Sequence, residues 1–189
     1  MYRQVYHHRV LLASESVNRA IVQRARDLGS GLPFCDETAR AVLESKTPLD
    51  LSLENIFDMR ESWWRYHVQA WRKSSDKILS DLCDRLLNRR LFKTVRIDGD
   101  EEQLLKTAKQ AVLQAGFDPH YYLHIIRSED VHLAEAGSSM QVLKDNGEIV
   151  GLGECEPLWD ALTREAGGAA RRSWLVLPGE AKALLGRER

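Results

Sequence analysis

The chain has 189 residues, of which 43% are hydrophobic and 29% are charged, so it can bury a core and form one or two domains. Its 27 basic and 28 acidic residues give a formal net charge of −1, which excludes an overall attraction to nucleic acid or to an anionic membrane. Any anion site must therefore be local.

The first part of the chain has the pattern of a helical bundle. Neither proline nor glycine occurs between Tyr2 and Leu28, and apolar residues recur there at helical spacing, which predicts one long helix. A short helix is expected over Glu37 to Ser45, and Ser52 is expected to cap the next helix. The predicted apolar faces of the long helix and of the helix after Ser52 are Val10, Val17, Ile21 and Leu28, and Phe57, Trp64, Val68 and Trp71.

Ser74 or Ser75 is expected to cap a third long helix, which completes a helical bundle fragment over residues 1–93. This helix is expected to bury its apolar side and to leave Lys77, Asp84 and Arg85 in solvent. The buried side is predicted to carry Ile78, Leu79, Leu82 and Leu86.

Residues 94–189 predict a small α+β domain with an antiparallel hairpin. The hairpin is expected around Asp145-Asn146-Gly147, because Asn and Gly tolerate positive φ. Helices are predicted from Asp100 to Gly116 and from Pro157 to about Glu165. The predicted strands are Thr94 to Asp98, Tyr121 to Ile126, Met140 to Leu143, Ile149 to Leu152 and Ser173 to Leu177.

The cellular compartment follows from the apolar runs and the cysteines. The longest runs, such as Val10 to Ala13, are far shorter than the roughly 18 residues of a spanning helix, and the amino terminus has no signal-peptide core. Cys35, Cys83 and Cys155 are odd in number and widely spaced, so they are expected to be reduced thiols. The sequence therefore predicts a cytoplasmic protein.

Two polar clusters could carry binding chemistry. In the opening segment, Met1 to Arg9, helical spacing places Tyr2 and Tyr6 on one face, and such rings could pack against a sugar or base. The second cluster, Asn88 to Lys93, is a basic helix end that could bind an anion. Each also has a plainer interpretation: a solvated helix start for the first, and cations favoured by the helix dipole for the second.

Other catalytic patterns are weak. His120 and His124 have four-residue spacing in a stretch that reads as a strand, without an acidic or cysteine ligand at a suitable offset for zinc. Glu129, Asp130 and His132 lack a nucleophile or partner that would make them a triad or dyad. The sequence also contains no P-loop, GxSxG or GxGxxG motif.

The opening segment, followed some 80 residues later by Arg89-Arg90-Leu91-Phe92-Lys93, resembles the HD-domain deoxynucleoside triphosphohydrolases and their bacterial phosphohydrolase relatives. In that family a similar opening segment begins the long helix after the catalytic core, and an R-x-L-F-K run closes a later helical pair. The resemblance covers residues 1 to about 97 well and the α+β region more weakly.

The resemblance implies roles for individual residues. Substrate contacts are implied for Tyr6, which is similar to a tyrosine that packs on the deoxyribose, for His7 beside it, and for Tyr2, where animal members carry a histidine. Contacts with a regulatory nucleotide between subunits are implied for His8, Arg9, Arg89 and Lys93.

The family's metal ligands are a histidine, a His-Asp pair and a later aspartate, which activate a water for attack on phosphorus. No histidine in this sequence is followed by aspartate, so those ligands would lie before Met1, and no catalytic residue, metal site or cofactor is expected in this chain itself. The chain is then an excised domain, a truncated product or one part of a split enzyme, and it is expected to be inactive alone.

Two functions follow as expectations. In the first, the chain supplies a substrate-site wall and an oligomerisation platform to a nucleotide phosphohydrolase, with the HD core or further copies of itself as partners. In the second, it is a non-enzymatic module that self-associates or binds a partner through an apolar patch such as Val10, Val17 and Ile21. An autonomous enzyme that uses His120 or His124 has little support.

Overall fold

A computed structural model describes residues 9–97, 99–128, 141–155 and 172–185. The chain divides into two compact units: the first comprises Met1–Ile125 and Leu175–Arg189, and the second Ile126–Trp174. This division by contacts differs from the predicted boundary at residue 93. The separate roles expected on either side of that boundary stay a prediction.

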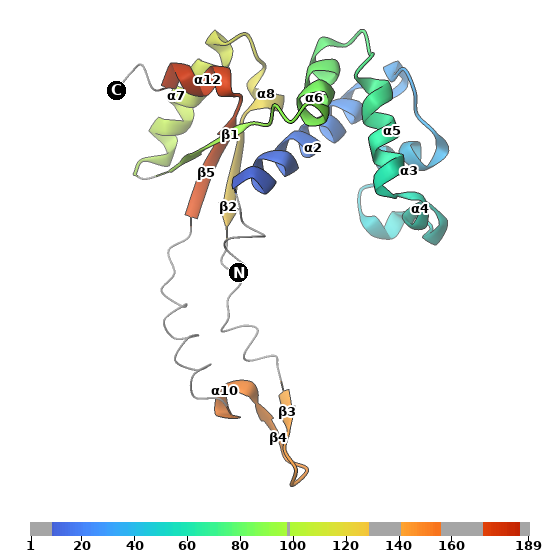
Figure 1. The fold of residues 1–189 in the computed structure, drawn as a ribbon, viewed down its shortest axis with the longest axis vertical. Helices are drawn as coiled ribbons and strands as arrows, with labels where there is room; N and C mark the ends of the chain where they lie inside the picture. The colour runs from blue at the N-terminus through green and yellow to red at the C-terminus, as the bar shows by residue number, and fades with distance from the viewer. Residues whose placement is uncertain (1–8, 98, 129–140, 156–171, 186–189) are drawn as a thin grey trace. The chain divides into compact units, whose positions relative to one another are not determined.

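The first part of unit 1 is helical, as the sequence predicts, and Figure 1 shows α2 running beneath α6 and towards α5. Because it contains no glycine or proline, α2 continues for 20 residues. Asp36 caps α3 by accepting a hydrogen bond from the Ala39 amide. The elements are α2 (Arg9–Leu28), η1 (Gly29–Gly31), α3 (Glu37–Glu44), η2 (Pro48–Asp50), α4 (Leu53–Asp58), α5 (Glu61–Trp71) and α6 (Lys77–Leu87).

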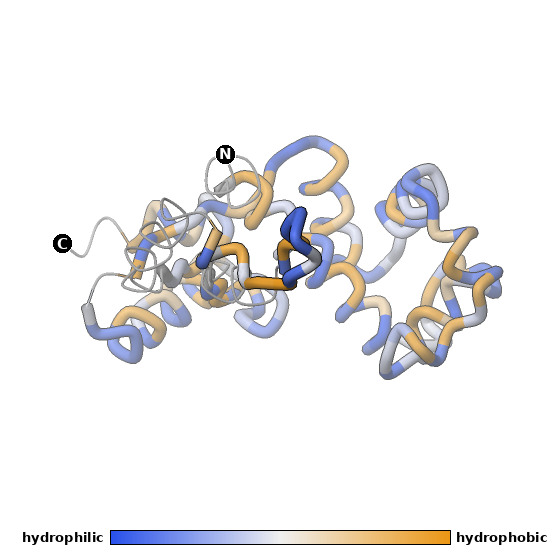
Figure 2. Tube along the Cα trace, turned by 90° about the horizontal axis from the view of Figure 1, so that it is seen from below, coloured by the Kyte–Doolittle hydropathy of each residue, from blue (hydrophilic) through white to orange (hydrophobic). Residues whose placement is uncertain are grey.

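The core of this helical part lies where α2 packs against α6. Val17 and Ile21 of α2 and Leu79 and Leu82 of α6 are completely buried. Figure 2 shows hydrophobic and hydrophilic residues in alternation along the described trace, as expected where helices bury one face. The predicted inner faces of both helices are thus confirmed at their centres.

The rest of unit 1 holds a three-stranded sheet of order β1-β5-β2, with α7 and α12 packed against each other beside it. Three consecutive residues of β5, Leu175 to Leu177, are completely buried, so this central strand belongs to the core. The division between the units falls within β2 and β5. The elements are β1 (Lys93–Arg96), α7 (Glu101–Gln114), α8 (Pro119–Tyr122), β2 (His124–Ser128), β5 (Arg172–Leu177) and α12 (Gly179–Leu185).

The described part of unit 2 contains the predicted hairpin. Strands β3 (Gln141–Leu143) and β4 (Ile149–Gly151) pair antiparallel, with Val142 opposite Val150. Gly147 has a φ of 81°, which confirms the positive φ expected of this turn. A short helix, α10 (Leu152–Cys155), follows β4. The helix predicted from Pro157 lies outside the described residues.

The single helix predicted after Ser52 is wrong, because the structure has two. Ser52 does cap the first of them, α4, by accepting a hydrogen bond from the Asn55 amide. The backbone then leaves the helical region at Met59 (ψ 62°) and Arg60 (ψ 163°), where no glycine or proline signals a break. The apolar stripe is interrupted there, and Phe57 is 71% exposed.

Two further boundaries differ from the prediction. Asp76, not Ser74 or Ser75, caps α6 through the Leu79 amide, while the Ser74 hydroxyl accepts a hydrogen bond from the Asp76 amide. Tyr121 and Tyr122 are helical, because Asp118 caps a turn whose first residue, Pro119, has a φ already suited to a helix. The strand begins only at His124.

Arg85 is buried, which corrects the expectation that it faces solvent. Its side chain is 4% exposed and donates to Asp81 at 2.7 Å and to both carboxylate oxygens of Glu180 at 2.8 and 3.2 Å. Its guanidinium lies 5.0 Å from the ring centroid of Phe117. Burial alone would lower the pKa of Arg85, but the bonds to Glu180 and Asp81 outweigh it and raise that pKa.

Candidate functional site

The candidate site begins at the end of α6, where Arg89 has a left-handed backbone with a φ of 54°. The Arg89 amide donates to the Leu86 carbonyl at 3.3 Å, and the Arg90 amide donates to the Arg85 carbonyl at 2.9 Å. This pair of bonds is the Schellman motif, whose left-handed position is usually glycine because a side chain there is strained. An arginine therefore occupies a position where the backbone favours glycine.

The side chain of Arg89 has no structural role that would explain its place. It is exposed, and within the described parts of the chain it forms no hydrogen bond or ion pair. A non-glycine residue in this conformation costs roughly 1 kcal/mol or more. Strain that the fold does not require is typical of functional positions.

Arg89 lines a cavity of about 510 Å³ between α2, α5 and α6, here named the α2 cavity. A volume of this size is in the range of small-molecule sites. Arg89 and Leu91 of the second motif meet Val10 and Leu11 here, which directly follow the opening motif. The lining residues are Val10, Leu11, Ser14, Asn18, Glu61, Trp64, Arg65, Val68, Leu86, Leu87, Arg89 and Leu91.

The indole of Trp64 links α5 to α2 in the wall of the α2 cavity. Trp64 donates from its Nε1 to the Asn18 Oδ1 at 2.8 Å, and its ring meets Trp71 edge to face with centroids 5.8 Å apart. The Asn18 amide nitrogen in turn donates to the Ser14 carbonyl at 2.9 Å. Trp64 therefore serves packing more than ligand stacking, which agrees with its expected place on an apolar stripe.

Sequence reasoning missed most of this lining. Leu11, Ser14 and Asn18 follow one another at spacings of three and four residues, so they share one face of α2. That spacing could have identified the face, but nothing in the sequence indicates that α5 and α6 enclose it. Arg65, exposed on α5, carried no signal beyond its charge.

The predicted site residues are only partly described. Tyr2, Tyr6, His7 and His8 lie outside the described residues, and Arg9 begins α2. Their expected contacts with a nucleotide stay predictions. The structure does place Arg89 at the rim that Val10 and Leu11 form, immediately after the opening motif.

Lys93 is separated from Arg89 by its place in the sheet. It belongs to β1, is exposed, and does not line the α2 cavity. A methyl group added at Gly179 would lie 3.7 Å from the Lys93 Cγ and Cε, so the stem of the lysine runs beside the start of α12. A shared contact of Lys93 and Arg89 with one ligand stays a prediction.

The histidine pair considered for zinc is divided between two environments. The His124 ring donates from Nε2 to the Tyr121 carbonyl at 3.0 Å and stacks on Phe92, and burial lowers its pKa. His120 is exposed, with its Nε2 3.9 Å from an Asp27 oxygen. Within the ranges that the structure describes, no three His, Cys, Asp or Glu side chains gather so that they could hold a metal ion.

The cytoplasmic location is expected from reduced cysteines and from the lack of a long apolar run in the sequence. Cys35 and Cys83 are free thiols, and burial raises the pKa of Cys83 to about 12. In the described parts of the chain, no helix is long and apolar enough to cross a membrane. The cytoplasmic location stays a prediction.

No model of a known protein family matches the chain. It is 34% identical over 160 residues to the uncharacterized protein YwfO of Bacillus subtilis (strain 168), an alignment that covers 79% of this chain and 36% of YwfO. A crystal structure of a phosphohydrolase from Bacteroides thetaiotaomicron superposes with a TM-score of 0.68 at 22% identity. The superposition covers 94% of this chain and 46% of that phosphohydrolase.

The chain has the fold of a segment of this phosphohydrolase. It spans less than half the length of YwfO and less than half that of the phosphohydrolase. The superposition supports the fold that the sequence resemblance to bacterial phosphohydrolases implies. Activity, substrate and assembly are not carried by the fold.

Proposed function

We propose that the chain forms one wall of a nucleotide site in an HD-type phosphohydrolase and that Arg89 contacts the phosphate groups there. The observation that carries this proposal is the α2 cavity, which Arg89 and Leu91 of the second motif line together with Val10 and Leu11, the two residues that directly follow the opening motif. A guanidinium with no partner among the described residues can bind phosphate through two parallel hydrogen bonds.

The proposed contacts follow the resemblance residue by residue. Tyr2, Tyr6 and His7 are proposed to face the substrate deoxynucleotide, whereas His8, Arg9, Arg89 and Lys93 are proposed to hold a second, regulatory nucleotide. Arg9 begins α2 and Val10 lines the α2 cavity, so the end of the opening motif is joined directly to the rim. Lys93 belongs to β1 and does not line the α2 cavity.

Hydrolysis is proposed to depend on HD metal ligands that this sequence does not contain, since no histidine is followed by aspartate. The described residues do not fit a metal site, so no catalytic step is assigned to the chain. The purified chain is expected not to hydrolyse deoxynucleoside triphosphates with magnesium. Robust metal-dependent hydrolysis would contradict this part of the proposal.

Calorimetric titration of the chain with a panel of deoxynucleoside triphosphates and magnesium tests the binding proposal. Arg89→Gly is the sharpest variant, because it removes the guanidinium and at the same time relieves the left-handed strain. We expect saturable binding by the wild type, and affinity lower by about tenfold or more in Arg89→Gly, since a charge-assisted bond contributes about 1.5–3 kcal/mol. Tyr6→Ala tests the opening motif in the same way.

The control is the stability of the same variants in denaturant. Weaker binding by an Arg89→Gly protein that is at least as stable as the wild type would assign the loss to the side chain. Equal binding by the wild type and Arg89→Gly, or no heat with any nucleotide, would refute the proposal.

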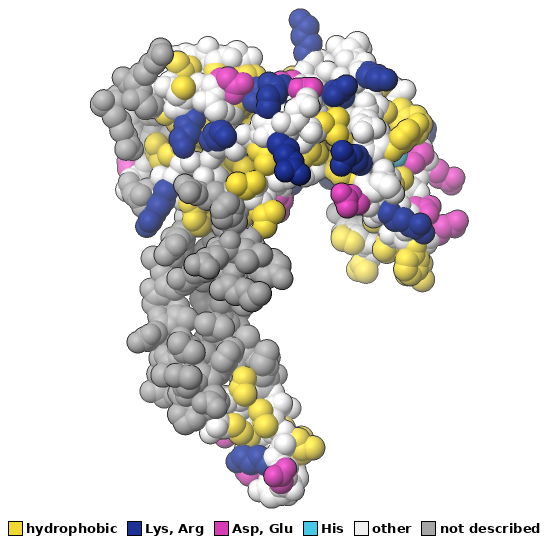
Figure 3. Space-filling view, viewed as in Figure 1, with side chains coloured by type: hydrophobic (Ala, Val, Ile, Leu, Met, Phe, Trp, Pro, Cys, Tyr) yellow, Lys and Arg dark blue, Asp and Glu magenta, His cyan; other side chains and the backbone are white. Residues whose placement is uncertain are grey.

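A second candidate is an association module, and it is favoured by exposed apolar residues at a different place from the one predicted. Val17 and Ile21 are completely buried in the core, so they form no patch. Around α4, in contrast, Leu49 is 94%, Leu53 73% and Phe57 71% exposed, and Figure 3 shows hydrophobic side chains at this tip. Exposed apolar clusters of this kind often mark interaction surfaces.

Sedimentation over a range of concentrations separates the two candidates. An association module is expected to form dimers that Phe57→Ser and Leu53→Ser weaken, whereas nucleotide binding at Arg89 should be unchanged in these variants. A monomer at every concentration would count against self-association.

A further inference from the structure

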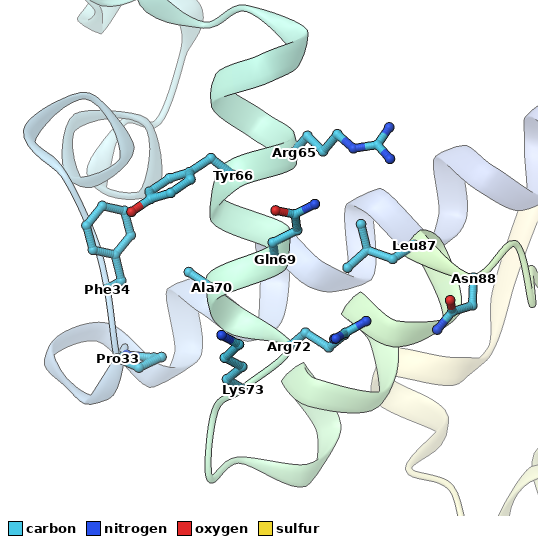
Figure 4. A pocket seen from close by; sticks show the side chains of 10 residues that line it. All are labelled: Pro33, Phe34, Arg65, Tyr66, Gln69, Ala70, Arg72, Lys73, Leu87 and Asn88. Carbon is cyan, nitrogen blue, oxygen red and sulfur yellow. The ribbon is translucent and has the colours of Figure 1, made fainter.

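A second concave surface, which is basic, shares Arg65 and Leu87 with the α2 cavity. This surface, named the α5 groove, encloses about 690 Å³. Figure 4 shows α5 between two walls, with Pro33 and Phe34 on one side and Leu87 and Asn88 on the other. The lining residues are Pro33, Phe34, Arg65, Tyr66, Gln69, Ala70, Arg72, Lys73, Leu87 and Asn88.

The charge of the α5 groove contrasts with that of the chain. Its described lining contains Arg65, Arg72 and Lys73 and no aspartate or glutamate, although the chain as a whole has a net charge of −1. Asp84 lies 4.0 Å from Arg72, and it also accepts hydrogen bonds from Asn88 and Arg90. The described lining therefore carries three cations, of which Arg72 faces Asp84.

The helix dipole explains only part of this charge. Arg72 caps the end of α5 and Lys73 follows it, where cations are favoured by the partial negative charge of the helix terminus. Arg65 lies seven residues before Arg72, nearly two turns away, and projects from the same side of α5 in Figure 4. Within the described residues no ion pair is formed by Arg65 or Lys73, so both cations are available to an anionic ligand.

An aromatic wall adds a second kind of contact. The rings of Phe34 and Tyr66 meet edge to face with centroids 5.3 Å apart, and Tyr66 is 58% exposed. Phe34 is also packed against the buried His67, at 5.1 Å between centroids, so this wall is anchored in the core. Gln69 and Asn88 supply amide groups that can donate and accept hydrogen bonds.

We propose that the α5 groove binds a small organic phosphate, whose phosphate is held by Arg65, Arg72 and Lys73 and whose planar ring lies against Tyr66. Guanidinium and ammonium groups bind phosphate, and an exposed tyrosine packs against planar rings. The groove and the α2 cavity differ in the residues that would contact a ligand. Lys73 and Tyr66 do not line the α2 cavity, and Arg89 does not line the groove.

The test is calorimetric titration of the full chain, in separate experiments, with adenosine monophosphate, inorganic phosphate and adenosine. We expect the monophosphate to bind most tightly, with affinity about tenfold lower in Lys73→Met because one charge-assisted bond is lost. Tyr66→Leu should weaken the monophosphate but not inorganic phosphate. Lys77→Met removes an exposed lysine of α6 outside the groove and is the matched control, expected to bind as the wild type does.

Arg89→Gly separates this proposal from the one for the α2 cavity. Binding of adenosine monophosphate that Lys73→Met weakens and Arg89→Gly leaves unchanged would support the groove. The proposal is overturned by the absence of saturable binding, by binding that Lys73→Met does not alter, or by binding that Lys77→Met weakens equally.

Discussion

The ends of α6 and α7 have the same backbone geometry and different residues at its strained position. After α7, the Gly116 amide donates to Leu113 at 2.9 Å and the Phe117 amide donates to Val112 at 3.0 Å, which is the bonding pattern found after α6. Gly116 has a φ of 81°, and Arg89 has a φ of 54°. One helix end uses the residue that the backbone favours, and the other retains a cation at the rim of a cavity.

The two helix ends also meet. Phe117, which closes the motif after α7, lies under the guanidinium of Arg85, whose carbonyl accepts the closing bond of the motif after α6. Packing between Arg85 and Phe117 holds both helix ends in place. The left-handed position can therefore carry a residue other than glycine, as Arg89 shows. Four changes can test this account.

The largest effect is expected for Arg85→Met, which removes the side chain that links the two ends. It leaves Asp81 and Glu180 without their buried partner, so unfolding free energy should fall by about 2–3 kcal/mol. Denaturant unfolding measures this, and Lys77→Met on the exposed side of the same helix should change little. A fall as large in Lys77→Met would mean that general helix effects dominate.

Gly116→Ala should lower stability by about 1 kcal/mol, because alanine is strained at positive φ. A Cβ at Gly116 has nothing within 4 Å, so steric contact adds no cost and the backbone alone is tested. Gly31→Ala is the matched control, since its Cβ also has open space and its φ is not positive. Equal effects in thermal unfolding would show that the left-handed geometry is not the cause.

Arg89→Gly should raise stability by about 0.5–1 kcal/mol, the opposite sign, because glycine relieves the same strain after α6. Chemical denaturation measures the gain, and Arg90→Gly, one residue later, should show none. A loss of stability in Arg89→Gly would mean that this side chain supports the fold, and the argument from strain would no longer hold.

The smallest effect on stability is expected for Glu180→Gln, which removes the carboxylate that pairs with Arg85. The hydrogen bonds from Arg85 hold the pKa of Glu180 below its ordinary value of 4.5, so the stabilisation is present above pH 4.5 and is lost as the pH falls through the lower folded pKa. Glu180 is half exposed, so Glu180→Gln should cost only about 0.5 kcal/mol at neutral pH. The difference from the wild type should vanish in acid, and a difference that persists there would exclude this ion pair as its source.

Sequence patterns predicted the elements better than their ends. The hairpin around Gly147 and the helix from Asp100 were predicted because each depends on a few neighbouring residues, a turn pair in one case and a cap in the other. The break at Met59 and the burial of Arg85 could not be predicted in this way. No glycine or proline marks the break, and the burial of Arg85 depends on Glu180, which is 95 residues away.

Of the residues that line the candidate site, the sequence identified Arg89 but missed most of the others. The R-x-L-F-K run selected Arg89, yet its charge alone did not distinguish it from Arg65 or Arg72. The left-handed backbone of Arg89 and the α2 cavity emerge only when α2, α5 and α6 are packed together. The α5 groove had no sequence signal beyond charges at helical spacing.

The sequence by itself determined most of the helices, which faces the two long helices bury at their centres, where the hairpin turns, and which two segments resemble a phosphohydrolase. Those features follow from short-range periodicity and from the conformational preferences of single residues. The tertiary structure decided that Val10 and Arg89 line one cavity, that Arg85 is buried, and that Lys93 lies apart in the sheet. Such relations depend on long-range packing, in which each residue's environment is set by elements that are distant along the chain.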